Sequence, residues 1–199
     1  IRMASPYRSV TFNTLRFPFD DVRVRKAIAQ AIDRDGLAWI AGFGELLAKS
    51  DYLAVNTPFY DPAYRDVLKY DVDAANRQLD EAGWTQRDTQ GYRVKDGRRL
   101  SAQLLGFESP SFPSNVAVAV QADVKKVGMQ LSIQMMPLAQ LTDRRTAGNY
   151  DAIGGGYWHT NTPDGLYILY HSDSRASPTK SGNNLSNLSD PHLDQLLGA

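Results

Sequence analysis

The 199-residue sequence contains no cysteine, and this absence removes three kinds of chemistry at once. Without cysteine there are no disulfides, no thiolate metal ligands and no cysteine nucleophile. The absence is compatible with reducing and oxidising compartments alike, so it does not indicate where the protein resides.

The sequence also lacks an excess of charge of one sign, because its 22 basic and 22 acidic residues cancel. No basic patch follows from composition, and nucleic acid is therefore not an expected partner. The apolar runs fall short of the roughly 18 residues that a membrane-spanning helix needs, so we expect no membrane insertion by this chain. Hydrophobic residues make up 42% of the chain, which is typical of a globular domain.

A signal peptide is missing too, since Ile1, Arg2 and Met3 are followed by polar residues. The chain does not start with an initiator methionine either. We therefore expect a fragment of a longer protein, whose targeting signal or lipid anchor this sequence does not reveal.

Motifs of catalysis, nucleotide binding and metal binding are absent. The glycine run Gly154–Gly156 has neither a Gly-Lys-Ser/Thr ending nor a GxGxxG pattern. The three histidines, His159, His171 and His192, have no HxxxH spacing, and no Gly-x-Ser-x-Gly elbow occurs. We expect no catalytic residue, no metal and no cofactor, and we expect His171 and His192 to be structural.

Predicted strands and helices alternate along the chain. Residues of β-rich character predict a strand at Ser9–Asn13, and helical spacing predicts one helix from Asp20 or Asp21 to about Ile40, with an Asp21–Arg25 ion pair. The remaining predicted helices are Val72–Ala82, Pro113–Val127, Leu138–Ala147 and Asp190–Leu197, and the remaining strands are Tyr92–Val94, Leu100–Leu105, Met129–Met135 and Tyr150–Trp158. Lys95–Arg98 predicts a hairpin, whereas Gly42–Tyr70 and Ser172–Asn187 are expected to be irregular. This alternation predicts an α/β domain with a mixed sheet flanked by helices.

Six blocks of this sequence, in order, resemble the second lobe of family 5 solute-binding proteins, the dipeptide, oligopeptide and nickel-binding group. The blocks are Phe17–Leu37, Tyr70–Trp84, Ala117–Gln134, Leu141–Trp158, Thr162–Ser174 and Asn184–Leu197. The resemblance implies that residues 1–199 form one lobe of a two-lobed periplasmic-binding-protein-like fold (type II, cluster C). The other lobe would come from the flanking segments of the chain.

The resemblance also implies a function and a location. Such a protein is a substrate-binding component of an ABC importer, which captures peptides or similar small solutes in an interlobe cleft and delivers them to the transmembrane subunits of the permease. It would be a monomer outside the cytoplasmic membrane, either periplasmic or anchored as a lipoprotein. The alternative is a regulatory or sensory protein on the same fold, which a fused DNA-binding or signalling segment would reveal.

Candidate ligand contacts gather where the last predicted strand ends. Glycines allow close approach of a ligand or another backbone, and aromatic rings offer flat apolar surfaces. The resemblance places ligand contacts at Tyr157, Trp158, His159, Thr160, Asn161 and Asp164. It adds Arg145, whose guanidinium would suit a ligand carboxylate. The alternatives are a strand end packed by aromatics and, for Asp143 to Arg145, a solvated helix face.

One position departs from the peptide-binding branch of the family. That branch pairs the α-ammonium of its peptide with an aspartate, and the corresponding place here is His159 or Thr160. Neither carries a fixed negative charge at neutral pH, although Asp164 could substitute. We therefore expect a ligand without a free ammonium at this point, such as a blocked peptide, a sugar-like molecule or a neutral amide.

Overall fold

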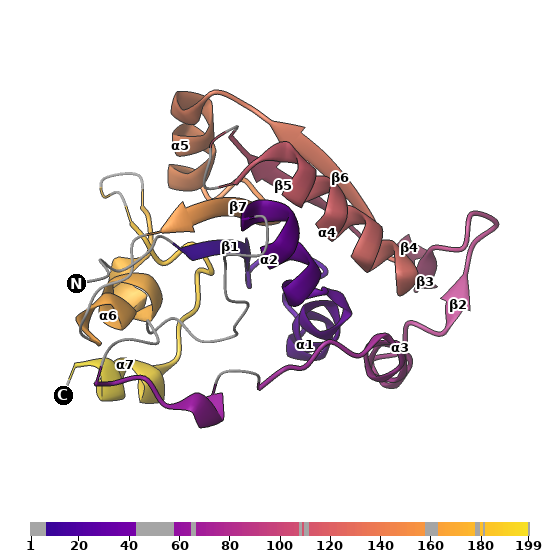
Figure 1. Ribbon diagram of the computed structural model, residues 1–199, viewed down its shortest axis with the longest axis horizontal. Coiled ribbons are helices and arrows are strands. Elements are labelled where there is room, and N and C mark those ends of the chain that lie inside the picture. Colours follow the sequence, from indigo (N-terminus) through magenta and orange to yellow (C-terminus); the bar gives the residue numbers. More distant parts are fainter. Residues whose placement is uncertain are drawn as a thin grey trace.

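The computed structural model describes residues 7–42, 58–64, 67–107, 109, 112–157, 163–177, 180 and 182–198 (Figure 1). Its centre is a four-stranded sheet in the order β1-β7-β5-β6. The strands are β1 (Tyr7–Phe12), β5 (Ser101–Gly106), β6 (Gln130–Met135) and β7 (Ala152–Tyr157). Strand β1 runs antiparallel to β7, whereas β5 is parallel to both β6 and β7. The predicted α/β architecture with a mixed sheet is thus confirmed.

Helices surround this sheet and also extend away from it. They are α1 (Val22–Ala31), α2 (Arg34–Gly42), α3 (Val72–Glu81), α4 (Ser114–Lys126), α5 (Leu138–Thr146), α6 (Asp164–Tyr170) and α7 (Pro191–Leu197). Two short 3-10 turns occur at η1 (Pro62–Tyr64) and η2 (Ser172–Ser174). Figure 1 places α6 and α7 at one end of the molecule and α3 at the other. No described helix is long and apolar enough to cross a membrane.

The two faces of the sheet bury separate apolar clusters, because successive strand residues point to opposite faces. Leu104 and Ala152 belong to the larger cluster, which α1, α3 and α4 complete. Their neighbours Leu105 and Ile153 belong to a smaller cluster, which also contains Leu141 of α5. The sheet is therefore fixed from both sides.

Aspartate side chains cap the starts of three of the predicted helices. Asp21, Asp71 and Asp190 each accept backbone N–H groups at the start of a helix. After α3, Gly83 adopts a φ of 91°, and the N–H of Trp84 donates to the carbonyl of Leu79 at 2.9 Å. These contacts account for the starts of α1, α3 and α7 and for the glycine-terminated end of α3.

The predicted helix to Ile40 is wrong in one respect, because it is two helices. Asp33 separates them: its Oδ1 accepts the N–H of Gly36 at 3.0 Å, and its own N–H donates to Asp123 at 3.0 Å. The predicted Asp21–Arg25 pair is also replaced. Asp21 pairs with Arg23 at 2.7 Å, while Arg25 donates to the carbonyl of Phe19 at 2.7 Å.

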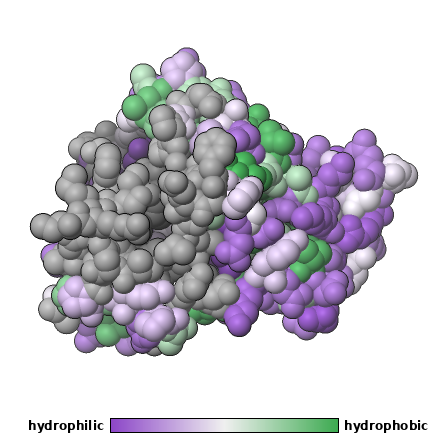
Figure 2. Space-filling model, in the orientation of Figure 1, coloured by the Kyte–Doolittle hydropathy of each residue, from purple (hydrophilic) through white to green (hydrophobic). Residues whose placement is uncertain are grey.

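The predicted hairpin is confirmed, but the strand after it is divided. A three-stranded sheet is formed by β2 (Gln86–Arg87), β3 (Arg93–Lys95) and β4 (Arg98–Arg99). Asp96 and Gly97 turn between β3 and β4 with φ values of 51° and 72°, as a two-residue hairpin requires. The chain then passes through the buried Leu100 into β5 of the main sheet. Figure 2 shows mostly hydrophilic residues at this end of the molecule.

Candidate functional site

The candidate ligand segment begins at the end of β7, a strand held on both sides. Register pairs Tyr157 with Tyr7 at this end, while Leu104 and Leu105 of β5 pair with the start of β7. Trp158, His159, Thr160 and Asn161 lie outside the described residues. The chain is described again from Pro163, which precedes α6.

Two consecutive glycines of β7 have different surroundings. A Cβ added at Gly154 would lie 2.1 Å from Cζ of Phe112, a side chain only 1% exposed. At Gly155 an added Cβ would meet no atom of the described residues within 4 Å. Gly154 therefore serves core packing, as the structural alternative proposed, whereas Gly155 has no such partner in the described part of the chain.

Asp164 is the first residue of α6, a helix that was not among the predicted elements. It is exposed, and so are Tyr167 (37%) and Ile168 (47%), which follow it at helical spacing. One face of α6 thus presents a carboxylate, a phenol and an aliphatic side chain. This helix was missed because Pro-Asp-Gly is a strong local turn signal.

Arg145 lies in the last turn of α5 and is half buried. Its Nε is buried and has no hydrogen-bond partner among the described residues. Its positive charge acts on Tyr150: burial raises the pKa of that phenol, while a hydrogen bond with Asn187 and the charge of Arg145 oppose the rise. Arg145 is therefore not part of a fully solvated helix face, the alternative considered from the sequence.

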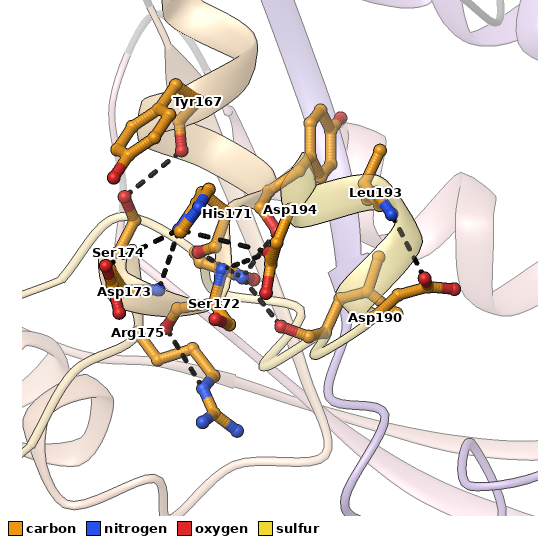
Figure 3. A network of polar contacts seen from close by, with 12 residues as sticks. Tyr167, His171, Ser172, Asp173, Ser174, Arg175, Asp190, Leu193 and Asp194 are labelled. Atoms are coloured by element: carbon orange, nitrogen blue, oxygen red, sulfur yellow. Dashed lines mark hydrogen bonds and ion pairs between the residues drawn. The ribbon is translucent and has the colours of Figure 1, made fainter. Parts of the chain in front are cut away.

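Sequence reasoning did not find the polar network that joins α6, η2 and α7 (Figure 3). The ring of His171 stacks on Tyr167 with centroids 4.1 Å apart. Its Nδ1 accepts the N–H of Asp173 at 3.1 Å and lies 3.9 Å from carboxylate oxygens of both Asp173 and Asp194. His171 is thus structural, as predicted. The sequence predicted the helix that begins at Asp190 but not its contacts with His171 and Ser172.

Asp194 is the member of this network that α7 supplies. Its Oδ1 accepts the backbone N–H of Ser172 at 2.8 Å. Hydrogen bonds from Ser172 hold the pKa of Asp194 below its usual value, helped by the nearby charges of His171 and Arg175. Asp194 is therefore held in its ionised form as an acceptor for η2.

A second polar network links the first strand to the last loop. The hydroxyl of Tyr150 donates to the carbonyl of Leu185 at 2.7 Å and accepts from Nδ2 of Asn187 at 2.9 Å. Asn187 also donates to Oδ1 of Asn13 at 3.1 Å, and Nδ2 of Asn13 donates to the carbonyl of Tyr150 at 2.9 Å. These side chains are at most 9% exposed, so the network fixes the loop to the sheet.

A metal site is not evident in this part of the molecule. Among the described residues, no group of three or more histidine, aspartate or glutamate side chains could hold a metal ion. The carboxylates near His171 are instead engaged with backbone N–H groups or exposed to solvent.

Comparison with known proteins assigns the chain to a family. Residues 4–179 match the family described as bacterial extracellular solute-binding proteins, family 5 Middle. The chain belongs to this family. The resemblance and the extracytoplasmic location it implied are thereby confirmed, and the members to which this family 5 chain is similar are binding proteins rather than enzymes.

Several relatives are similar over nearly the whole chain. The oligopeptide-binding protein AppA of Bacillus subtilis is 27% identical over 202 residues, which cover 98% of this chain and 36% of AppA. A probable di/tripeptide-binding protein of Pseudomonas aeruginosa is 30% identical over 196 residues, covering 94% of this chain and 33% of the relative. The family 5 chain thus spans about a third of the length of these relatives.

Solved structures share the fold. AppA in complex with a nonapeptide superposes with a TM-score of 0.82 at 24% identity, over 98% of this chain and 38% of AppA. A mannohexaose-bound periplasmic oligopeptide-binding protein of Thermotoga maritima gives a TM-score of 0.84 at 20% identity, over 98% of this chain and 38% of that protein. The predicted fold class of a periplasmic-binding-protein lobe is therefore confirmed.

Proposed function

We propose that this chain is the ligand-binding second lobe of the substrate-binding component of an ABC importer. The observation that carries the proposal is the family match over residues 4–179. The protein captures a peptide or similar small solute in an interlobe cleft, closes on it by a hinge motion and delivers it to the transmembrane subunits of the permease. It has no chemistry of its own.

Residues 1–199 form one lobe in this proposal, and flanking segments of the parent chain form the other. The limited span of the chain supports this division, since relatives extend to about three times its length. The parent works as a monomer in the periplasm or anchored to a membrane by lipid.

The ligand contacts proposed from the sequence lie along the segment from β7 to α6 and on α5. They are Tyr157, Trp158, His159, Thr160, Asn161, Asp164 and Arg145. Two observations support the described members: Asp164 is exposed at the start of α6, and the buried Nε of Arg145 has no partner in the part of the chain that the structure describes. An unpaired buried guanidinium N–H is costly, and a ligand carboxylate would satisfy it.

Native mass spectrometry of the full-length protein, purified without denaturation, tests the function. A small solute that leaves on denaturation is the expected result. If the parent instead carries no solute, begins with a helix-turn-helix segment and lacks any signal sequence, the protein is a regulator and the proposal fails.

The contribution of Arg145 is tested by calorimetry with that solute. Arg145→Ala should weaken binding of a carboxylate-bearing solute by about 1.5–3 kcal/mol, the range for hydrogen bonds to charged groups. Arg144→Ala is the matched control, because it removes an equal charge from the neighbouring position of α5. Equal affinities of the two variants would exclude Arg145 as a ligand contact.

A further inference from the structure

Among the described residues, helix α6 contributes to neither of the two buried apolar clusters. Neither buried cluster contains a residue of α6 or α7, although both helices are described. α6 has 7 residues, and a helix this short does not persist in water without tertiary contacts. Leu169 of α6 is mostly buried, with 9% of its surface exposed. Other contacts must therefore fix its position.

Asn184 supplies the first of these contacts. Asn184 is only 1% exposed. Its Nδ2 donates to the carbonyls of Tyr170 and His171 at 3.0 and 3.1 Å. These carbonyls lie at the C-terminal end of α6, where a side-chain donor can stabilise the helix end. The carbonyl of His171 also accepts the N–H of Ser174 at 3.0 Å. Nδ2 also donates to the carbonyl of Leu188 at 3.0 Å. Asn184 therefore connects the end of α6 to the loop that contains Asn184 and Leu188.

The loop of Asn184 is in turn fixed to the sheet. The neighbouring carbonyl of Leu185 accepts the hydroxyl of Tyr150, and Asn187 bonds to both Tyr150 and Asn13. Hydrogen bonds thus fix Leu185 and Asn187 to the sheet, and Asn184 in the same stretch of backbone bonds to the end of α6. Removing the side chain of Asn184 would take a donor away from the carbonyls of Tyr170, His171 and Leu188.

Asp194 supplies a second contact, from α7. Its Oδ1 accepts the N–H of Ser172, two residues beyond the end of α6, and lies 3.9 Å from His171 (Figure 3). His171 stacks on Tyr167 of α6 itself. The two contacts act on the same end of the helix from different elements.

We propose that Asn184 and Asp194 are positioning residues for ligand binding. By holding the C-terminal end of α6, they orient the whole short helix and place the exposed face of Asp164, Tyr167 and Ile168 relative to the end of β7. The proposed ligand contacts at the end of β7 and those on α6 then keep their positions relative to one another. The functional part of this inference rests on the proposed role of that segment in ligand binding.

Backbone amide NMR of the chain tests the positioning. Asn184→Ala and Asp194→Ala should shift the amide signals of Gly165–Tyr170 and speed their hydrogen exchange, while Ile28 of α1 and Ile153 of β7 stay unchanged. Asn183→Ala is the matched control, since Asn183 is an exposed neighbour. Asp194→Asn should restore the wild-type signals, because its amide oxygen still accepts from Ser172.

Three results would overturn the positioning role. They are unchanged α6 signals in both alanine variants, equal changes at Ile28 and Ile153, and failure of Asp194→Asn to restore α6 where the domain stays folded. The first means that α6 is fixed by other contacts. The second and third mean that these residues support the whole domain, or act through charge.

The link to binding is measured separately, as occupancy by the co-purified solute in native mass spectra of the full-length protein. Occupancy should fall in Asn184→Ala and Asp194→Ala but not in Asn183→Ala. A displaced α6 with unchanged occupancy would overturn this link. The NMR result needs no ligand, so failure of the proposed function and failure of the positioning role are distinguishable.

Discussion

At the scale of single residues, the glycines of β7 illustrate how one amino acid serves different purposes at adjacent positions. We predict that Gly154→Ala destabilises the fold by about 1–3 kcal/mol, the usual cost of overpacking, because its Cβ would enter the space of the Phe112 ring. Urea unfolding measures this loss. Gly155→Ala is the control in the same strand and should be nearly neutral. Equal losses in both variants would mean that strand backbone, rather than Phe112, sets the requirement.

Asp21 offers a pH-dependent prediction for a single carboxylate. A hydrogen bond from Arg23 lowers its pKa from the usual 3.8, with burial opposing. A carboxylate with a lowered folded-state pKa contributes stability above its unfolded value, and this contribution is lost as pH falls through the folded value. Asp21→Asn keeps the N-cap acceptor but removes the charge. It should therefore cost less than about 1 kcal/mol at pH 7, as expected for exposed pairs, and nothing well below pH 3.8.

Urea unfolding of Asp21→Asn and Asp21→Ala at both pH values separates charge from capping. The alanine variant should lose about 1 kcal/mol more than the asparagine variant at either pH, because it also removes the cap. A difference between wild type and Asp21→Asn that persists in acid would contradict the role of the ion pair.

At the scale of elements, local sequence signals predicted most boundaries and failed where distant contacts decide. The caps at Asp71 and Asp190 and the Asp96-Gly97 turn depend on nearby backbone groups, so a local pattern contains them. The division of the first helix depends partly on Asp123, 90 residues away from Asp33. No periodicity contains such a contact.

The site was predicted less completely than the fold, for the same reason. Arg145 and Asp164 were found through family resemblance, and their contacts with a ligand stay predictions. Asn184 lies in a polar stretch that locally resembles a loop, and its contacts with the carbonyls of Tyr170 and His171 form only when the end of α6 packs against that stretch. Polar residues that join distant segments carry no periodic signal.

Arg93 makes further contacts between elements that the sequence did not predict. It is 3% exposed, and its guanidinium donates to the carbonyl of Val127 at 2.8 Å, to that of Trp84 and to the side chain of Asp80. It thus joins the C-terminal ends of α3 and α4 to β3. We predict that Arg93→Met destabilises the fold by about 3 kcal/mol, since it leaves buried carbonyls unpaired.

Thermal and urea unfolding measure the loss in Arg93→Met. Arg87→Met is the control, because Arg87 also lies in the small sheet but is exposed. A loss in the Arg93 variant no larger than in the control would mean that α3 and α4 are held by their apolar contacts alone.

At the scale of the whole molecule, the chain has its own core but only part of the proposed site. We predict that residues 1–199 fold as a monomer and bind the solute of the full-length protein far more weakly. Burying a ligand on one surface instead of two removes several kcal/mol, and each 1.4 kcal/mol is about tenfold in affinity. The edge strands β1 and β6 are the expected hazard for self-association. Sedimentation tests the monomer, and calorimetry tests the binding of the solute to residues 1–199. An obligate oligomer, or submicromolar binding of the solute, would contradict this two-lobe account.

The charge of the ligand can also be predicted for the full-length protein. His159 or Thr160 stands where the peptide-binding branch pairs an aspartate with the α-ammonium, and neither supplies a fixed negative charge. A desolvated ammonium there would lack its partner, which costs several kcal/mol. We therefore predict that N-acetylation of short peptides does not weaken their binding in calorimetric titrations. Asp164 provides the sharpest counter-test, because it begins α6 and is exposed. Tight binding that is lost on acetylation, and lost again in Asp164→Asn, would show that this carboxylate captures the ammonium after all.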